Sequence, residues 1–251
     1  MCMRKNIDNI EAEARANRQE ILTKMTDIFA GTYGAVVTPI GSMSSTGKQD
    51  FLSDIDAWVS VPDDAIDEVL QRRNELYAEA GNELITWERP SYAPLGGVHS
   101  IVLYDGEKTV SPTEIDYFIA PASKDEYYKE YIAGGGPDEK LEWRIGADDQ
   151  SLGARLDYTA LVTMWAGKYW HRRIDRQNQL EWATRRFTEV TRDAELCSDI
   201  PDSLAGTIGT LTLIIDSLHE KVKQLEDPKR MRAYQKIAHT ISLVEALETE
   251  S

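Results

Sequence analysis

Cysteine, basic residues and long apolar runs are all scarce in this sequence. Its 251 residues include only two cysteines, Cys2 and Cys197, too few and too far apart for a disulfide framework or a zinc site. No run approaches the roughly 18 apolar residues that a membrane span needs. Arg4 and Lys5 are followed by polar, acidic sequence without an apolar core, so we expect no signal peptide. These absences predict a cytoplasmic protein with no membrane partner.

Positive charge is also in short supply. Lysine and arginine together number 28 against 43 aspartates and glutamates, which gives a formal net charge of −15. Nucleic-acid backbones bind clustered lysine and arginine, so the charge balance excludes a nucleic acid as the main partner. It favours attraction of a polycationic small molecule.

One stretch of the N-terminal half combines the residues that phosphate and metal chemistry need. A strand-like run over 34–40 ends at Gly41 and Ser42, and Asp54 and Asp56 open a second apolar run. Side chains at i and i+2 of a strand share a face, about 7 Å apart, so these two carboxylates repel each other unless a cation lies between them. Mg²⁺ suits such oxygen ligands. Gly41 permits close approach of a phosphate, to which the Ser42 hydroxyl can donate.

A third acidic element lies further along the chain. The strand pattern over 113–119 carries Glu114 and Asp116 on one face, and Ile115 and Tyr117 flank Asp116. The bland alternative is that all these carboxylates lie on solvated strand faces, and for Glu114 that alternative is as good as a functional role. The glycine-serine pair, the Asp54 and Asp56 strand and the Asp116 strand follow one another in this order. Their combination favours a metal site over solvated strand faces for the three aspartates.

The order Gly-Ser, about a dozen residues, Asp-x-Asp and a later acidic strand resembles the nucleotidyltransferase superfamily that includes DNA polymerase beta. Within it, the chain is most similar to the aminoglycoside and lincosamide nucleotidyltransferases, and the motifs cover roughly residues 34–120. The resemblance implies two Mg²⁺ ions and ATP as co-substrate. It implies metal ligation by Asp54, Asp56 and Asp116, and nucleotide binding by Gly41 and Ser42.

The resemblance also implies roles on the acceptor side and in the C-terminal half. Asp116 is expected to act as the general base or as a ligand of the second ion, with Glu114 as the alternative base. A lysine from the helical half, Lys168, is expected to reach the β- and γ-phosphates. His99 and His171 lack metal-ligand spacing and are expected to be ordinary hydrogen-bonded side chains. Acidic residues such as Glu88 are candidates for binding ammonium groups of the acceptor.

Hydrophobic periodicity predicts an α/β (α+β) fold, with a small mixed sheet flanked by helices and followed by a C-terminal helical bundle. Asp105 and Gly106 predict a hairpin turn, and the glycines at 134–136 predict a linker between domains 1–136 and 137–251. The predicted helices are 8–29, 62–80, 125–136, 156–174, 179–197, 202–225 and 228–247, and the predicted strands are 34–40, 54–61, 83–87, 98–104 and 109–120.

The resulting hypothesis is transfer of AMP from ATP to a hydroxyl of a small, cationic molecule. An aminoglycoside is the first candidate acceptor and a lincosamide the second, which would make the chain an antibiotic-resistance enzyme, monomeric or homodimeric. The alternative is an antitoxin-like protein of the same fold that binds or nucleotidylates a partner protein. A catalytically inactive regulatory member is a further alternative, against which the intact Asp54, Asp56 and Asp116 count.

Overall fold

A computed structural model of the chain describes residues 2–40, 49–106, 108–126, 151–193 and 200–249. The predicted helix over 125–136 and the glycine linker lie largely or wholly outside these residues. The described elements are α1 (Cys2–Tyr33), β1 (Val36–Ile40), β2 (Ile55–Val61), α2 (Ile66–Ala80), β3 (Glu83–Glu88), η2 (Pro90–Tyr92), β4 (Val98–Tyr104), β5 (Thr113–Pro121), η3 (Ala122–Lys124), α4 (Leu152–Arg172), α5 (Arg176–Asp193), α6 (Gly209–Val222), η4 (Lys223–Leu225) and α7 (Pro228–Thr249).

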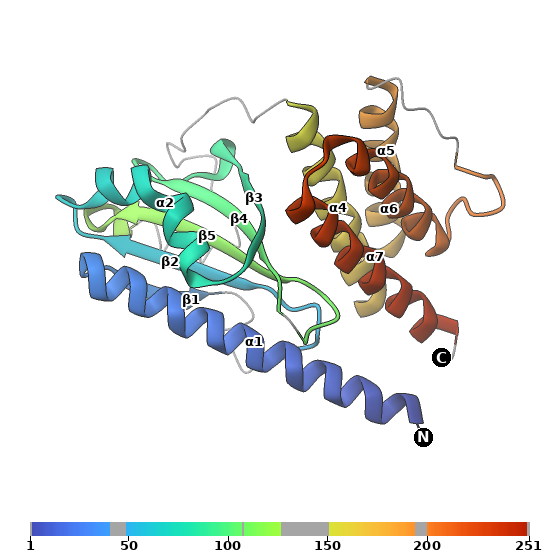
Figure 1. The fold of residues 1–251 in the computed structure, drawn as a ribbon, viewed down its shortest axis with the longest axis horizontal. Coiled ribbons are helices and arrows are strands. Elements are labelled where there is room, and N and C mark those ends of the chain that lie inside the picture. Colours follow the sequence, from blue (N-terminus) through green and yellow to red (C-terminus); the bar gives the residue numbers. More distant parts are fainter. Residues whose placement is uncertain (1, 41–48, 107, 127–150, 194–199, 250–251) are drawn as a thin grey trace. The chain divides into compact units, whose positions relative to one another are not determined.

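The chain divides into two compact units, Met1–Asp148 and Asp149–Ser251. All five described strands belong to the first unit, and α4 to α7 belong to the second (Figure 1). The predicted fold class, a mixed sheet flanked by helices and followed by a helical region, is confirmed. The predicted domain boundary at 136 falls in the segment 127–150, outside the described residues.

The sheet of the first unit has the strand order β1-β2-β5-β4-β3. The two central strands β2 and β5 run parallel, and the other neighbours pair antiparallel. Pro39 lies in the edge strand β1, where the missing N–H of proline is tolerated. The parallel step is possible because α2, β3 and β4 intervene in the chain between β2 and β5, which gives the long crossover that parallel strands need.

Helices α1 and α2 pack on one face of the sheet, where the main core lies. The apolar residues that recur at three- and four-residue spacing along α1 face this core: Met25 and Phe29 have no exposed surface, and Ile21 and Leu22 have little. Fully burying a side chain of this size stabilises the fold by about 1.5–3 kcal/mol. Alternate residues of β2 and β5, such as Ile55 and Ile115, complete this core. Their neighbours in sequence therefore face the other side of the sheet.

Three buried tyrosines link the strands to α2 within this core. The hydroxyls of Tyr104 and Tyr117 lie 2.7 Å apart, and the Tyr104 hydroxyl donates to the Tyr77 carbonyl oxygen at 3.1 Å. The Tyr77 hydroxyl donates to Ser100 Oγ at 3.0 Å. Burial raises the pKa of each of the three phenols, so all stay neutral hydrogen-bonding groups at physiological pH. The sheet and α2 are thereby held in a fixed register.

Several predicted boundaries were wrong, most of all the start of the first helix, which is Cys2 and not residue 8, and that of α6, which is Gly209 and not residue 202. The strand predicted from Thr109 begins at Thr113, because Ser111 donates to the Phe51 carbonyl oxygen and Pro112 has no N–H for a strand ladder. The turn predicted at Asp105 and Gly106 is therefore only the start of a longer connection between β4 and β5. The helix predicted from Pro62 begins at Ile66.

The second unit is a set of helices around its own apolar core, in which α4 packs against α5, α6 and α7. A side chain at Gly167 of α4 would meet Ile241 Cδ1 of α7 at 2.4 Å, so glycine permits close approach of these two helices. A partly buried ion pair also joins them: the buried Asp157 of α4 accepts two hydrogen bonds from Arg230, at 2.7 and 2.9 Å, and one from the Tyr234 hydroxyl at 3.1 Å.

Candidate functional site

The predicted acidic residues lie on the face of the sheet opposite to α1 and α2. Residues 55, 57, 59 and 61 of β2 enter the helix-side core, so Asp56 points to the other face. The same alternation in β5 places Ile115 and Tyr117 in the core and Glu114 and Asp116 on the face that Asp56 shares. This face therefore gathers carboxylates from both central strands.

Asp56 and Asp116 are direct neighbours in the parallel pairing of β2 and β5. Neighbouring strands lie about 4.8 Å apart, so the two side chains extend side by side from the sheet. Both are partly exposed, and 19% of the Asp116 side chain is accessible to solvent. Two adjacent carboxylates of this kind repel each other and favour a cation between them.

Asp54 and Glu114 extend the acidic row toward the start of both strands. Asp54 directly precedes Ile55, which pairs with Ile115, so Asp54 and Glu114 lie at the same level of the sheet. Asp54 is partly exposed, whereas only 5% of Glu114 is accessible. Asp54 and Asp116 are thus more open to a ligand than Glu114 is.

A compact turn fixes the chain just before Asp54. The Asp50 carboxylate accepts hydrogen bonds from the backbone N–H of Leu52 and from the Ser53 hydroxyl, at 3.0 and 3.1 Å. Arg18, buried on α1, donates from Nη1 to the Ser53 carbonyl oxygen at 3.2 Å. The position at which Asp54 enters the sheet is therefore set by α1 as well as by its own turn.

His99 lies beside Asp116, and the prediction that it is an ordinary hydrogen-bonded residue is wrong. Its ring stacks on Phe118, with centroids 4.3 Å apart and planes at 10°, and its Nε2 is 3.6 Å from Asp116 Oδ2. Only 3% of His99 is exposed, and neither ring nitrogen has a hydrogen-bond partner among the described residues. An unpaired buried polar group costs about 1–3 kcal/mol, so this position needs a reason.

The imidazole of His99 is neutral at physiological pH. Burial, and secondly the positive charge of Arg89, lower its pKa to about 3. It therefore supplies no positive charge to offset the carboxylate of Asp116. Sequence reasoning missed this residue because only the pairing of β4 with β5, in which His99 lies opposite Phe118, brings it to the acidic face.

Asp125 marks the other end of the same face and was also missed. Its carboxylate accepts hydrogen bonds from Trp58 Nε1 at 3.2 Å and from the Ser60 hydroxyl at 2.7 Å. Trp58 and Ser60 follow Asp56 at two-residue steps along β2, so they share its face. The sequence did contain a pattern for this polar face of β2. Every second residue from 54 to 60 is polar, except Trp58, whose side chain carries an N–H donor.

Gly41 and Ser42, the predicted phosphate-binding residues, lie outside the described residues. Ile40, the last residue before them, pairs with Asp56 across β1 and β2. Lys168 is on α4 of the second unit and is buried; its contact with nucleotide phosphates stays a prediction. Glu88 pairs with Arg73 of α2 and lies on the helix side of the sheet, opposite Ser100, which makes it unsuitable for an acceptor on the acidic face.

Within the described ranges, no three His, Cys, Asp or Glu side chains are grouped closely enough to hold a metal ion by themselves. This finding does not conflict with a magnesium site, because Mg²⁺ is usually held by one or two carboxylates together with water and substrate phosphates. Asp56 and Asp116, which are neighbours in the pairing of β2 and β5, supply two carboxylates of the kind that such a site uses. No helix in the described part of the chain is long and apolar enough to cross a membrane.

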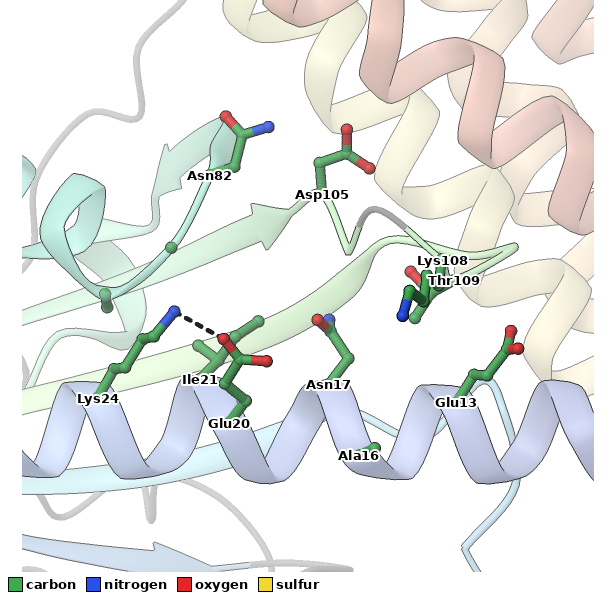
Figure 2. Close-up of a pocket in the computed structure, with 12 residues that line it drawn as sticks. Glu13, Ala16, Asn17, Glu20, Ile21, Lys24, Asn82, Asp105, Lys108 and Thr109 are labelled. Atoms are coloured by element: carbon green, nitrogen blue, oxygen red, sulfur yellow. Dashed lines mark hydrogen bonds and ion pairs between the residues drawn. The ribbon is translucent and has the colours of Figure 1, made fainter.

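A cavity of about 710 Å³ lies elsewhere in the first unit (Figure 2). It is lined by α1, the end of α2 and the connection after β4, and none of the predicted site residues contributes to it. Its wall is largely polar: Lys24 pairs with Glu20 at 2.7 Å, and Asn17 donates to Thr113 Oγ1 at 2.7 Å. We therefore assign the candidate site to the acidic face rather than to this cavity.

Comparison of the chain with protein-family models gave no match. A search of curated proteins gave no relative either. The candidate site is therefore defined by its own geometry, which consists of two carboxylates in register on the central parallel strands, a third at the entrance to β2 and a buried imidazole beside them.

Proposed function

We propose that this chain is a metal-dependent nucleotidyltransferase. The observation that carries the proposal is the pairing of Asp56 with Asp116 on adjacent parallel strands, partly exposed on the face away from α1 and α2. Within that class, the proposed activity is that of an adenylyltransferase, which transfers AMP from ATP to a hydroxyl of a small molecule.

Asp54 and Asp56 would hold one Mg²⁺ against the triphosphate, and Asp56 and Asp116, which are in register on β2 and β5, would hold a second. When bound, these ions neutralise charge on the phosphoryl oxygens and lower the pKa of the acceptor hydroxyl. The protein residues position the two reactants in line, which is the larger part of catalysis in this kind of reaction. The adjacent carboxylates of the two central strands support this role.

In the proposed step, the acceptor oxygen forms a bond to the α-phosphorus and the bond from that phosphorus to the bridging oxygen of the β-phosphate breaks. Pyrophosphate leaves, and the hydroxyl proton passes to Asp116 as general base. Asp116 is partly exposed whereas Glu114 is buried, which favours Asp116 for this role.

The proposed acceptor is a polycationic compound with free hydroxyls. The net charge of −15 raises the local concentration of such a molecule by electrostatic attraction. Aminoglycosides fit this description best, and lincosamides, which carry less positive charge, come second. In either case the chain would protect a bacterium from the antibiotic that it modifies.

The test is Mg²⁺-dependent release of pyrophosphate from ATP, measured for the purified chain across a panel of aminoglycosides and lincosamides. We expect release with at least one compound and none after Asp116→Asn. Asp27→Asn is the matched control, because Asp27 is an exposed carboxylate on α1. Release only after addition of a partner protein would favour the antitoxin-like alternative, and release that survives Asp116→Asn would overturn the site.

A further inference from the structure

The buried imidazole of His99 lies next to Asp116, the proposed base, and has no role in the proposed reaction. Its Nε2 lies 3.6 Å from Asp116 Oδ2, about 0.5 Å beyond the usual range for a hydrogen bond of this type. The ring stacks on Phe118, its paired residue on β5, and only 3% of the surface of His99 is exposed. Its direction is therefore set by packing.

The chemistry of this neighbour is limited to hydrogen bonding. A neutral imidazole carries one N–H donor and one acceptor nitrogen, and neither has a partner among the described side chains and backbone groups. A carboxylate only accepts hydrogen bonds. Of the two tautomers, only the one with its proton on Nε2 makes an attractive contact with Asp116. A shift of the carboxylate by about 0.5 Å closes that contact to a normal hydrogen bond.

We propose that His99 is a positioning residue, which donates a hydrogen bond from Nε2 to Asp116 and holds its carboxylate in the orientation that binds the metal and receives the acceptor proton. The inference rests on the proposed function, in which Asp116 has these roles. Groups that hydrogen-bond to metal-binding side chains orient them and raise their affinity, and their loss typically reduces metal affinity or activity by about 10- to 100-fold.

The test compares His99→Leu, which removes the donor, with His99→Gln, whose amide N–H can approach the Nε2 position. The first readout is the affinity for Mn²⁺ alone, measured by electron paramagnetic resonance without nucleotide. We expect His99→Leu to weaken Mn²⁺ binding by about 10-fold or more and His99→Gln to restore most of it. A role in packing alone predicts instead that both variants bind Mn²⁺ as the wild-type chain does, which would overturn the inference.

The second readout follows the wild-type protein by ¹⁵N NMR of the imidazole and so does not depend on the folding of a variant. We expect the wild-type imidazole to carry its proton on Nε2, and we expect the Nε2 resonance to change when Mg²⁺ is added. A proton on Nδ1 would refute the proposed donor.

These readouts separate the two proposals. If no antibiotic is adenylylated but Mn²⁺ binding depends on His99 as expected, the reaction class is wrong and the positioning role stands. If pyrophosphate is released and the kcat and Mn²⁺ affinity of His99→Leu equal those of the wild type, the function stands and the positioning role is wrong. If the wild-type chain binds no Mn²⁺, both fail.

Discussion

Replacing Asp56 by asparagine removes one of the two carboxylates that lie in register on β2 and β5. At the strand spacing of about 4.8 Å, two like charges repel by about 3 kcal/mol at an effective dielectric constant of about 20. Both groups are partly exposed, and solvent screening reduces the effect to about 1 kcal/mol. We therefore expect Asp56→Asn to raise the free energy of unfolding by about 1 kcal/mol in EDTA.

Addition of Mg²⁺ should make the wild-type chain more stable than Asp56→Asn. A ligand at ten times its dissociation constant stabilises the folded state by about 1.4 kcal/mol, and only the wild-type chain should gain this stability. Turnover of Asp56→Asn should fall by more than about 100-fold, the equivalent of about 3 kcal/mol of metal assistance. The assay is urea unfolding with EDTA or Mg²⁺, with Asp27→Asn as control. If Mg²⁺ stabilises wild type and Asp56→Asn equally, the metal assignment is refuted.

Three further predictions follow from buried groups. Because the pKa of His99 is lowered to about 3 from its ordinary 6.5, the unfolded chain takes up this proton first as the pH falls; lowering the pH from about 6.5 to about 4.5 should cost about 2 kcal/mol of stability, and a His99→Leu variant that unfolds with the same acid dependence would contradict this. Asp157→Ala removes the acceptor of two hydrogen bonds from Arg230 and of one from the buried Tyr234 hydroxyl, whereas Arg230 keeps Asp227 as a partner; it should cost about 1–3 kcal/mol in urea unfolding, against less than about 1 kcal/mol for Glu20→Gln on the surface, and equal losses would refute the reasoning. Asp125→Asn keeps the size of a side chain that accepts from Trp58 and Ser60 and should cost about 1–2 kcal/mol, with Asp27→Asn as control, and no loss would show that these contacts add nothing.

Local patterns in the sequence were sufficient for most of the fold. The strand predicted over 98–104 has the observed bounds of β4, and the three- and four-residue spacing of apolar residues such as Met25 and Phe29 predicted the core face of α1. The prediction failed where a contact from far along the chain decides the outcome. The late start of β5 depends on Ser111 binding the backbone of Phe51, a partner that periodicity cannot indicate.

The candidate site likewise contains residues that local spacing predicted and residues that only long-range contacts bring together. The i, i+2 spacing of Asp54 and Asp56 predicted a shared face, and alternation in the sheet agrees with it. That Asp116 lies beside Asp56 needed the strand order and the parallel register. His99 needed the stacking of its ring on Phe118 across a third strand, so only the assembled sheet brings it to the site.

The parallel pairing of β2 and β5 has a consequence for how the site comes into existence. Everything from α2 to β4 is synthesised between the two strands that carry Asp56 and Asp116, so a growing chain released before residue 113 holds only half of the paired carboxylates. Binding of a divalent ion across the two strands should begin only once the fifth strand docks in the middle of the sheet. Measuring the metal affinity of chains truncated at successive positions would then show at which chain length β5 has paired with β2.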